Sequence, residues 1–256
     1  MPRLAHPPAT GHSRRIQAKG TILRIAIVEN TAITHHGQIG VALHERAARI
    51  QIFRPWSDGI LPGSGDHDAL VVLGGEQNAL SDDTHPYLPA LARLMCDTGE
   101  SGRAVLGICL GAQLLARGLG AVNHIGTARE FGWLPVTRLA AAVHDPVLRN
   151  VPPDFPIFEW HSDTFTLPPG ATHLATTATA PVQAFRAFRA TYGMQFHFEA
   201  NRAVVADWSR EFPHLTEAIS PGWSLSHPAL ATTNGAQADH HGLTLARAWV
   251  DLVQTR

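Results

Sequence analysis

The chain has 256 residues, of which 45% are hydrophobic and 16% charged, so it can bury a sizeable core and fold unaided. Its 20 basic and 21 acidic residues give a formal charge of −1, which supplies no basic field to hold a phosphate backbone and so disfavours nucleic-acid binding. No apolar run approaches the roughly 20 residues that cross a bilayer, and two cysteines are too few for a disulfide framework, so we expect a cytoplasmic protein.

Residues 1–21 are rich in Pro, Gly, His and basic residues and lack hydrophobic periodicity, which predicts a flexible N-terminal extension. The pair Arg14-Arg15 would suit an export signal, but Lys19 and Arg24 interrupt the apolar run that follows it. Export is therefore the less favoured interpretation.

The next part of the chain alternates strand-like and helix-like patterns. Four compact runs rich in Val, Ile and Leu are typical of strands buried on both faces, namely residues 23–28, 49–53, 69–73 and 104–108. Helical periodicity fills 38–48 and 87–96. This alternation predicts a three-layer α/β fold, with a mostly parallel central sheet and helices on both faces.

After residue 121 the apolar runs become shorter and are broken by Pro and Gly, which predicts a small antiparallel appendage and one last strand that returns to the main sheet. Helical patterns return at 200–211 and 242–253, and the composition of 213–241 predicts irregular structure. We expect one domain over 22–211, with 212–256 packed on it as a loop and a helix.

The segment 104–120, AVLGICLGAQLLARGLG, carries the strongest functional signal. A buried strand leads through Gly107 and Cys109 directly into a helix, which is the strand–turn–helix context of a nucleophile elbow. The flanking glycines allow the sharp bend, and the helix N-terminus favours a thiolate on Cys109. On its own, however, a lone cysteine is as readily a small buried residue.

A possible partner for this cysteine is the segment 193–200, GMQFHFEA. In extended backbone, His197 and Glu199 would face the same way. A thiolate nucleophile needs a neighbour that moves protons, and that imidazole needs an acceptor that fixes its orientation. A third segment, VVLGGEQ at 71–77, places a double glycine after a strand, so the N–H groups of Gly75 and Leu110 could hold an oxyanion.

Together these segments resemble the class I glutamine amidotransferases, from about residue 24 to about residue 211. The resemblance implies a flavodoxin-like fold and a Cys109, His197 and Glu199 triad, with Gly75 and Leu110 forming the oxyanion hole. It also implies a set of substrate-binding residues, namely Gln113, Glu130, Phe131, Gly132, His161 and Asp163. His161 and Asp163 lie in EWHSDTF, which is similar to a segment of glutaminases related to GMP synthase.

The chain departs from the family pattern at two positions beside these motifs. Many members have proline where this chain has Phe198, and many have proline where it has Glu76. Neither change removes a group of the expected triad, but both could alter how the site is held or which protein docks there.

The resemblance implies hydrolysis of the side-chain amide of L-glutamine through a γ-glutamyl thioester on Cys109. The products would be glutamate and ammonia, and no cofactor or metal is expected. No phosphate-binding loop follows residue 211, so the ammonia acceptor would be a separate synthetase subunit, or there would be none. The near-neutral charge is compatible with a homodimer.

Two other functions stay open. The same triad in a wider pocket would suit a stand-alone γ-glutamyl hydrolase that acts on γ-glutamyl amines or peptides. A non-enzymatic redox sensor would use Cys109 as a reversibly oxidised thiol, but Cys96 has no evident geometry for resolving it.

Overall fold

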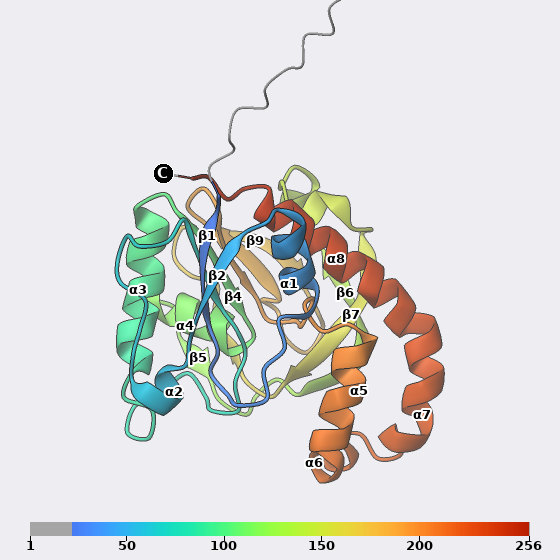
Figure 1. Ribbon diagram of the computed structural model, residues 1–256. Helices are drawn as coiled ribbons and strands as arrows, with labels where there is room; N and C mark the ends of the chain where they lie inside the picture. The colour runs from blue at the N-terminus through green and yellow to red at the C-terminus, as the bar shows by residue number, and fades with distance from the viewer. Residues whose placement is uncertain (1–21, 256) are drawn as a thin grey trace, which may run out of the picture.

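The computed structural model describes residues 22–255, so the extension expected at 1–21 lies outside the described residues. The described residues form a nine-stranded sheet with the order β2-β1-β3-β4-β11-β10-β9-β6-β7 (Figure 1). Its parallel part consists of β1 (Arg24–Val28), β2 (Arg49–Phe53), β3 (Ala69–Val72), β4 (Ala104–Ile108) and β11 (Thr191–Met194). These bounds follow the predicted strands closely, and β3 and β4 are buried along their whole length, as predicted for apolar runs. The prediction that 49–53 is buried on both faces is wrong, because β2 is the edge strand of the sheet and its residues are exposed or half-buried.

The later strands continue the same sheet in antiparallel fashion. They are β10 (Ala184–Ala187), β9 (Thr172–Thr176), β6 (Glu130–Arg138) and β7 (Asp154–His161). A separate two-stranded antiparallel sheet joins β5 (Asn123–His124) to β8 (Thr164–Phe165). The α/β class with an antiparallel portion is thus confirmed, and most of that portion extends the main sheet.

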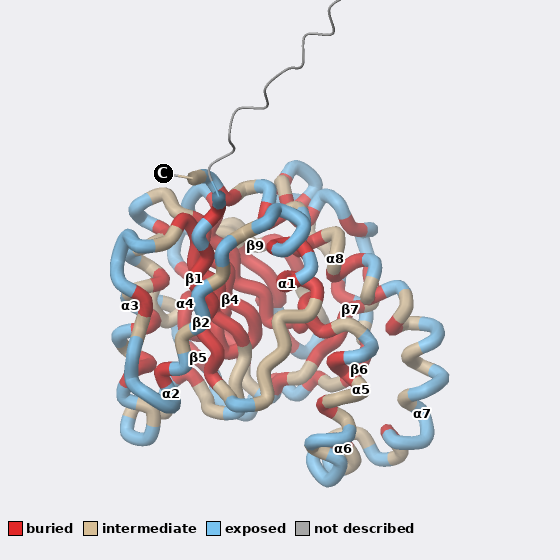
Figure 2. The backbone as a smooth tube through the Cα atoms, viewed as in Figure 1, coloured by how far each residue is buried: buried red, intermediate tan, exposed pale blue. Residues whose placement is uncertain are grey.

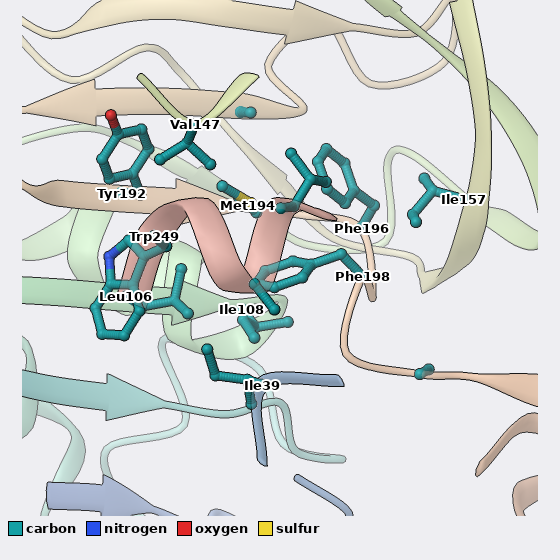
Figure 3. Close-up of a cluster of buried hydrophobic side chains, with 14 of the residues drawn as sticks. Ile39, Leu106, Ile108, Val147, Ile157, Tyr192, Met194, Phe196, Phe198 and Trp249 are labelled. Atoms are coloured by element: carbon teal, nitrogen blue, oxygen red, sulfur yellow. The ribbon is translucent and has the colours of Figure 1, made fainter. Parts of the chain in front are cut away.

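Helices cover both faces of the sheet, as the alternation of strand and helix predicts. The helices α1 (Gly37–Glu45) and α8 (Ala236–Val250) pack on one face, and α3 (Leu88–Glu100) and α4 (Leu110–Gly118) pack on the other (Figure 1). Neighbouring residues of β1 point to opposite faces, so Ile25 joins the first core and Ala26 the second. Figure 2 shows the buried strands at the centre, and Figure 3 shows Trp249 of α8 among the side chains of the first core.

Short helical segments complete the connections. They are α2 (Pro55–Asp58) and the 3₁₀ turns η1 (Ala140–Val143) and η2 (Leu148–Asn150). The helix α5 (Arg202–Glu211) begins at Asn201, whose side-chain oxygen accepts a hydrogen bond of 3.0 Å from the N–H of Val204.

The prediction of irregular structure over 213–241 is wrong. This stretch forms α6 (Pro213–Ile219), α7 (Trp223–Leu230), a π-helical turn (Ala231–Gly235) and the start of α8. Pro213 stands at the first turn of α6, where the missing N–H costs nothing, and Glu217 accepts 2.8 Å hydrogen bonds from the N–H groups of Gly222 and Ser224. The Pro, Gly and Ser residues therefore start and connect helices here.

The parallel strands β1, β3, β4 and β11 end at one edge of the sheet, as parallel neighbours must. The loops after these strands carry Gly75, Cys109, His197 and Glu199, and α4, which follows Cys109, carries Leu110 and Gln113. Within the part of the chain that the structure describes, no helix is long and apolar enough to span a membrane.

Candidate active site

Cys109 connects β4 to α4 in a strained conformation with φ 52° and ψ −111°. A positive φ is uncommon for a residue with a side chain and costs about 1–3 kcal/mol, so the surrounding packing must hold it. An ideal Cβ on Gly107 would lie 2.4 Å from the carbonyl oxygen of Gly111, and one on Gly111 would lie 2.0 Å from that of Val72. The two glycines are thus required for the close approach of α4 to β3 and β4.

The side chains of His197 and Glu199 meet at this edge of the sheet. Nδ1 of His197 lies 2.7 Å from Oε1 of Glu199, and both residues are buried. They lie in a turn after β11 rather than in the extended strand that the sequence predicts, and an isolated bridge joins His197 to Phe158. The N–H of His197 donates a 2.8 Å hydrogen bond to the carbonyl oxygen of Phe158, which fixes its backbone.

The His197 ring also faces Cys109. An ideal Cβ on Gly74 would lie 3.2 Å from Cε1 of His197 and 3.9 Å from Sγ of Cys109, so the glycine borders both groups. Burial alone would lower the pKa of His197, but the negative charges of Glu199 and Cys109 outweigh burial and raise it well above its usual value. The arrangement therefore favours the charged imidazolium form of His197 beside the cysteine.

Two backbone N–H groups are free beside the cysteine. Leu110 is the first residue of α4, so its N–H has no acceptor in the helix, and Gly75 follows the end of β3. Neither group donates a hydrogen bond within residues 22–255. Asn30 supports the turn after β3, because its Nδ2 donates a 2.8 Å hydrogen bond to the carbonyl oxygen of Leu73.

A cavity of about 450 Å³ opens over these groups. Cys109, His197 and Glu199 line it, and so do Gly75, Leu110, Gln113, His161 and Asp163, which are all residues expected from the sequence. The cavity also has lining residues that the sequence did not single out, namely Arg129, Trp160, Trp208, Phe212, Leu215 and Ile219. The exposed Arg129 forms no ion pair with any described residue, and its position directly before the expected substrate-binding residues Glu130, Phe131 and Gly132 was the one signal that could have identified it.

Three of the expected substrate-binding residues do not line this cavity. Glu130 is buried behind it, where Oε2 accepts hydrogen bonds of 2.7 Å from Gln183 and 3.0 Å from Thr177. Phe131 packs its ring 4.7 Å from that of Trp223, and Gly132 adopts φ +106° against the same indole. The three residues therefore support β6 and the helices packed on it.

A buried ionic cluster lies directly behind the cavity. Nε2 of His161 is 3.2 Å from a carboxylate oxygen of Glu130 and 3.2 Å from one of Glu159, although neither contact has hydrogen-bond geometry. Burial opposes a charge on His161, but the two carboxylates outweigh burial and raise its pKa to about 10. Glu130, Glu159 and His161 are the one set of potential metal ligands found among residues 22–255. An imidazolium placed between two carboxylates explains their close approach equally well without a metal ion.

Comparison with known protein families gives a match over residues 38–204 to the family described as Glutamine amidotransferase class-I. A glutamine amidotransferase-like protein of Salmonella typhimurium is 29% identical over 181 residues, which are 69% of this chain and 76% of that protein. A glutamine-hydrolysing GMP synthase of Mycobacterium bovis is 38% identical over 134 residues, which are 51% of this chain but 23% of that protein.

Two solved structures are similar over most of the chain. A glutamine amidotransferase from Thermotoga maritima has a TM-score of 0.81 and 24% identity, and it covers 92% of this chain and 100% of that one. A glutamine amidotransferase from Methylobacillus flagellatus has a TM-score of 0.79 and 23% identity, with 92% and 97% coverage. At this identity the likeness concerns the fold alone.

Proposed function

This chain belongs to the class I glutamine amidotransferase family, and we propose that it hydrolyses the side-chain amide of L-glutamine through a γ-glutamyl thioester on Cys109. The observation that supports this most is the strained cysteine at a helix N-terminus facing His197, whose other ring nitrogen lies 2.7 Å from Glu199. Nucleophile, proton carrier and orienting carboxylate are the groups that acyl transfer through a thiolate requires.

The proposed reaction begins with attack of the Cys109 thiolate on the side-chain amide carbon of glutamine. The N–H groups of Gly75 and Leu110 stabilise the oxyanion, and the His197 imidazolium protonates the departing ammonia as the C–N bond breaks. The neutral imidazole then takes a proton from water, which attacks the thioester and releases glutamate. Glu199 holds the imidazole in one orientation and stabilises its charged form throughout.

The remaining polar groups of the cavity suit the amino acid end of the substrate. The guanidinium of Arg129 is free to pair with the α-carboxylate. One carboxylate oxygen of Asp163 accepts a 2.8 Å hydrogen bond from the N–H of Gly126, which leaves the second oxygen for an α-ammonium group. Gln113 is buried beside the nucleophile and contacts Gln195, so it is positioned by its neighbours.

We also propose that the ammonia passes to a synthetase on a separate protein. The support is the likeness to glutamine-hydrolysing GMP synthases, although the matched part of the chain spans 23% of such a protein. Ammonia release from glutamine, measured with and without proteins that co-purify from the native host, tests this partner. A partner that couples the two reactions would raise the rate, whereas no effect from any co-purifying protein would contradict the coupling.

The role of Cys109 as the nucleophile that meets glutamine can be tested by mass spectrometry. A glutamine-like diazo ketone should label Cys109, and an excess of L-glutamine should protect it, because both compete for the same thiolate. Cys96 is the internal control, since burial and Glu100 raise the pKa of its thiol and it does not line the cavity. Label on Cys109 that glutamine does not reduce would contradict the proposal and would favour a redox thiol.

A further inference from the structure

The cavity has an aromatic wall beside the catalytic histidine. The ring of Trp208 on α5 lies 5.2 Å from that of His197, and Trp160 lies 5.7 Å from Trp208. Phe212 continues the wall, with its ring 5.8 Å from that of Trp160, and Leu215 on α6 extends it toward solvent. The cavity therefore has apolar side chains both next to the imidazole and at the exposed Leu215.

The position of this wall identifies which part of a substrate it would contact. An imidazolium that protonates a leaving amine must lie within hydrogen-bond reach of its nitrogen. The substituent on that nitrogen must then lie next to His197, which is where the wall begins. The charged ends of the γ-glutamyl group are matched instead by Arg129 and Asp163, which come from other segments of the chain.

Three of the four wall residues lie outside the segment matched by the family model, and Trp160 lies within it. The family match covers residues 38–204, whereas the cavity is also lined by 31–35 and by residues between 208 and 219. His35 lines the cavity and connects its segment to α5, because its Nε2 lies 2.7 Å from a carboxylate oxygen of Asp207. A site that releases only ammonia has no need of this surface, because ammonia offers nothing apolar to bury.

We propose that this wall is a leaving-group subsite for a hydrophobic amine, so that γ-glutamyl amides of apolar amines are substrates. The proposal rests on the thioester chemistry proposed above and specifies its substrate class. The thiolate of Cys109 attacks the amide carbon, the C–N bond breaks, and His197 gives its proton to the departing amine. Water then cleaves the thioester to glutamate, so no oxidant or further reactant is needed. A cavity of about 450 Å³ lies within the range of about 300–1,000 Å³ that holds drug-sized ligands.

The test compares two amides whose leaving amines have nearly equal basicity and differ in apolar size. They are γ-glutamyl methylamide and γ-glutamyl isopentylamide, and L-glutamine is assayed in parallel. We expect kcat/KM for the isopentylamide to exceed that for the methylamide by about tenfold or more, because the extra carbons bury against the wall.

A matched pair of variants locates the effect. Leu215→Ala removes a partly exposed leucine that lines the cavity, and Leu225→Ala removes an 87% exposed leucine on α7 that does not. Leu215→Ala should lower the ratio of kcat/KM for the isopentylamide to kcat/KM for the methylamide by about threefold or more. Leu225→Ala should leave this ratio unchanged. Both leucines are exposed enough that folding should persist.

The outcomes separate this proposal from the one on which it rests. Equal kcat/KM for the two amides, together with normal glutamine hydrolysis, would overturn the proposed amine subsite and leave the proposed thioester chemistry intact. That result is expected if an acceptor protein, rather than a leaving amine, contacts the wall. Hydrolysis of the isopentylamide without hydrolysis of glutamine would support the subsite and contradict the glutaminase. Hydrolysis of none of the three compounds would overturn both.

Discussion

Replacing Gly111 by alanine perturbs the packing that holds the Cys109 turn. Gly111 lies in the first turn of α4, and its new Cβ would lie 2.0 Å from the carbonyl oxygen of Val72 and 2.8 Å from the carbonyl carbon. Real Cβ atoms essentially never approach closer than 3.0 Å, so α4 and β3 must separate by about 1 Å. β3 is paired with β1 on one side and β4 on the other, which leaves it little freedom to move.

Two effects of opposite sign set the size of the change. Alanine favours a helix over glycine by about 1 kcal/mol, which would stabilise α4. Forcing the extra carbon against main chain costs about 3 kcal/mol, at the upper end of the range for overpacked cores. The net loss is about 2 kcal/mol of unfolding free energy, which corresponds to a fall in Tm of about 4–8 °C for a chain of this length.

Thermal unfolding and glutamine hydrolysis should both be measured on this variant. The rate of glutamine hydrolysis should fall even at temperatures where the variant is fully folded, since the start of α4 carries Leu110 and the Cys109 turn. Gly120→Ala is the control: Gly120 has φ +86° and nothing within 4 Å of its Cβ, so the substitution adds backbone strain of about 1 kcal/mol without a clash. The control should keep wild-type activity. A Gly111→Ala protein with unchanged Tm and activity would refute the packing argument.

Three further predictions concern charged groups. Glu199→Gln removes a charge that raises the pKa of His197, so the alkaline limb of the pH–activity profile should move to lower pH and kcat should fall about 10²- to 10⁴-fold; an unmoved limb would speak against the ion pair. His161 contributes stability that is fully present below its ordinary pKa of 6.5 and is lost as pH rises toward its folded pKa of about 10. The Tm difference between the wild type and His161→Gln should therefore be larger at low pH than at high pH, and an equal difference would contradict the buried imidazolium. Arg129→Gln should raise KM for glutamine about tenfold with less effect on kcat, and Arg129→Lys should raise KM by a smaller factor because it keeps the positive charge. An unchanged KM in Arg129→Gln would show that Arg129 does not bind the substrate.

The parallel half of the fold follows directly from the sequence. The run at 104–108 is a strand with those bounds, because a strand buried on both faces leaves an uninterrupted apolar signature. The run at 49–53 also has the predicted bounds, but it forms an exposed edge strand, which its Arg49 and Gln51 fit better than burial on both faces. The helices between 213 and 241 could not be recognised in the same way. Trp223 is buried there against β6 and β7, but Gly222 and Pro228 on either side are residues typical of turns.

The sequence likewise predicts only part of the candidate site. The sequence identifies Cys109, His197 and Glu199 as neighbours, and the structure brings the three side chains together although the backbone at His197 is a turn. The resemblance alone led to Phe131, whose ring packs in the core. The aromatic wall gives no local pattern, since Trp160 and Trp208 lie on a strand and a helix far apart in the chain.

The central claim is that the Cys109 thiolate carries the reaction, and the chain supplies its own matched control in the second cysteine. Ammonia release from L-glutamine should be measured for Cys109→Ala and for Cys96→Ala at equal concentrations of folded protein. Loss of the nucleophile should reduce the rate by about 10³-fold or more, while loss of Cys96, which lies on α3 away from the cavity, should leave it unchanged. A Cys109→Ala protein that releases ammonia at the wild-type rate would contradict the account.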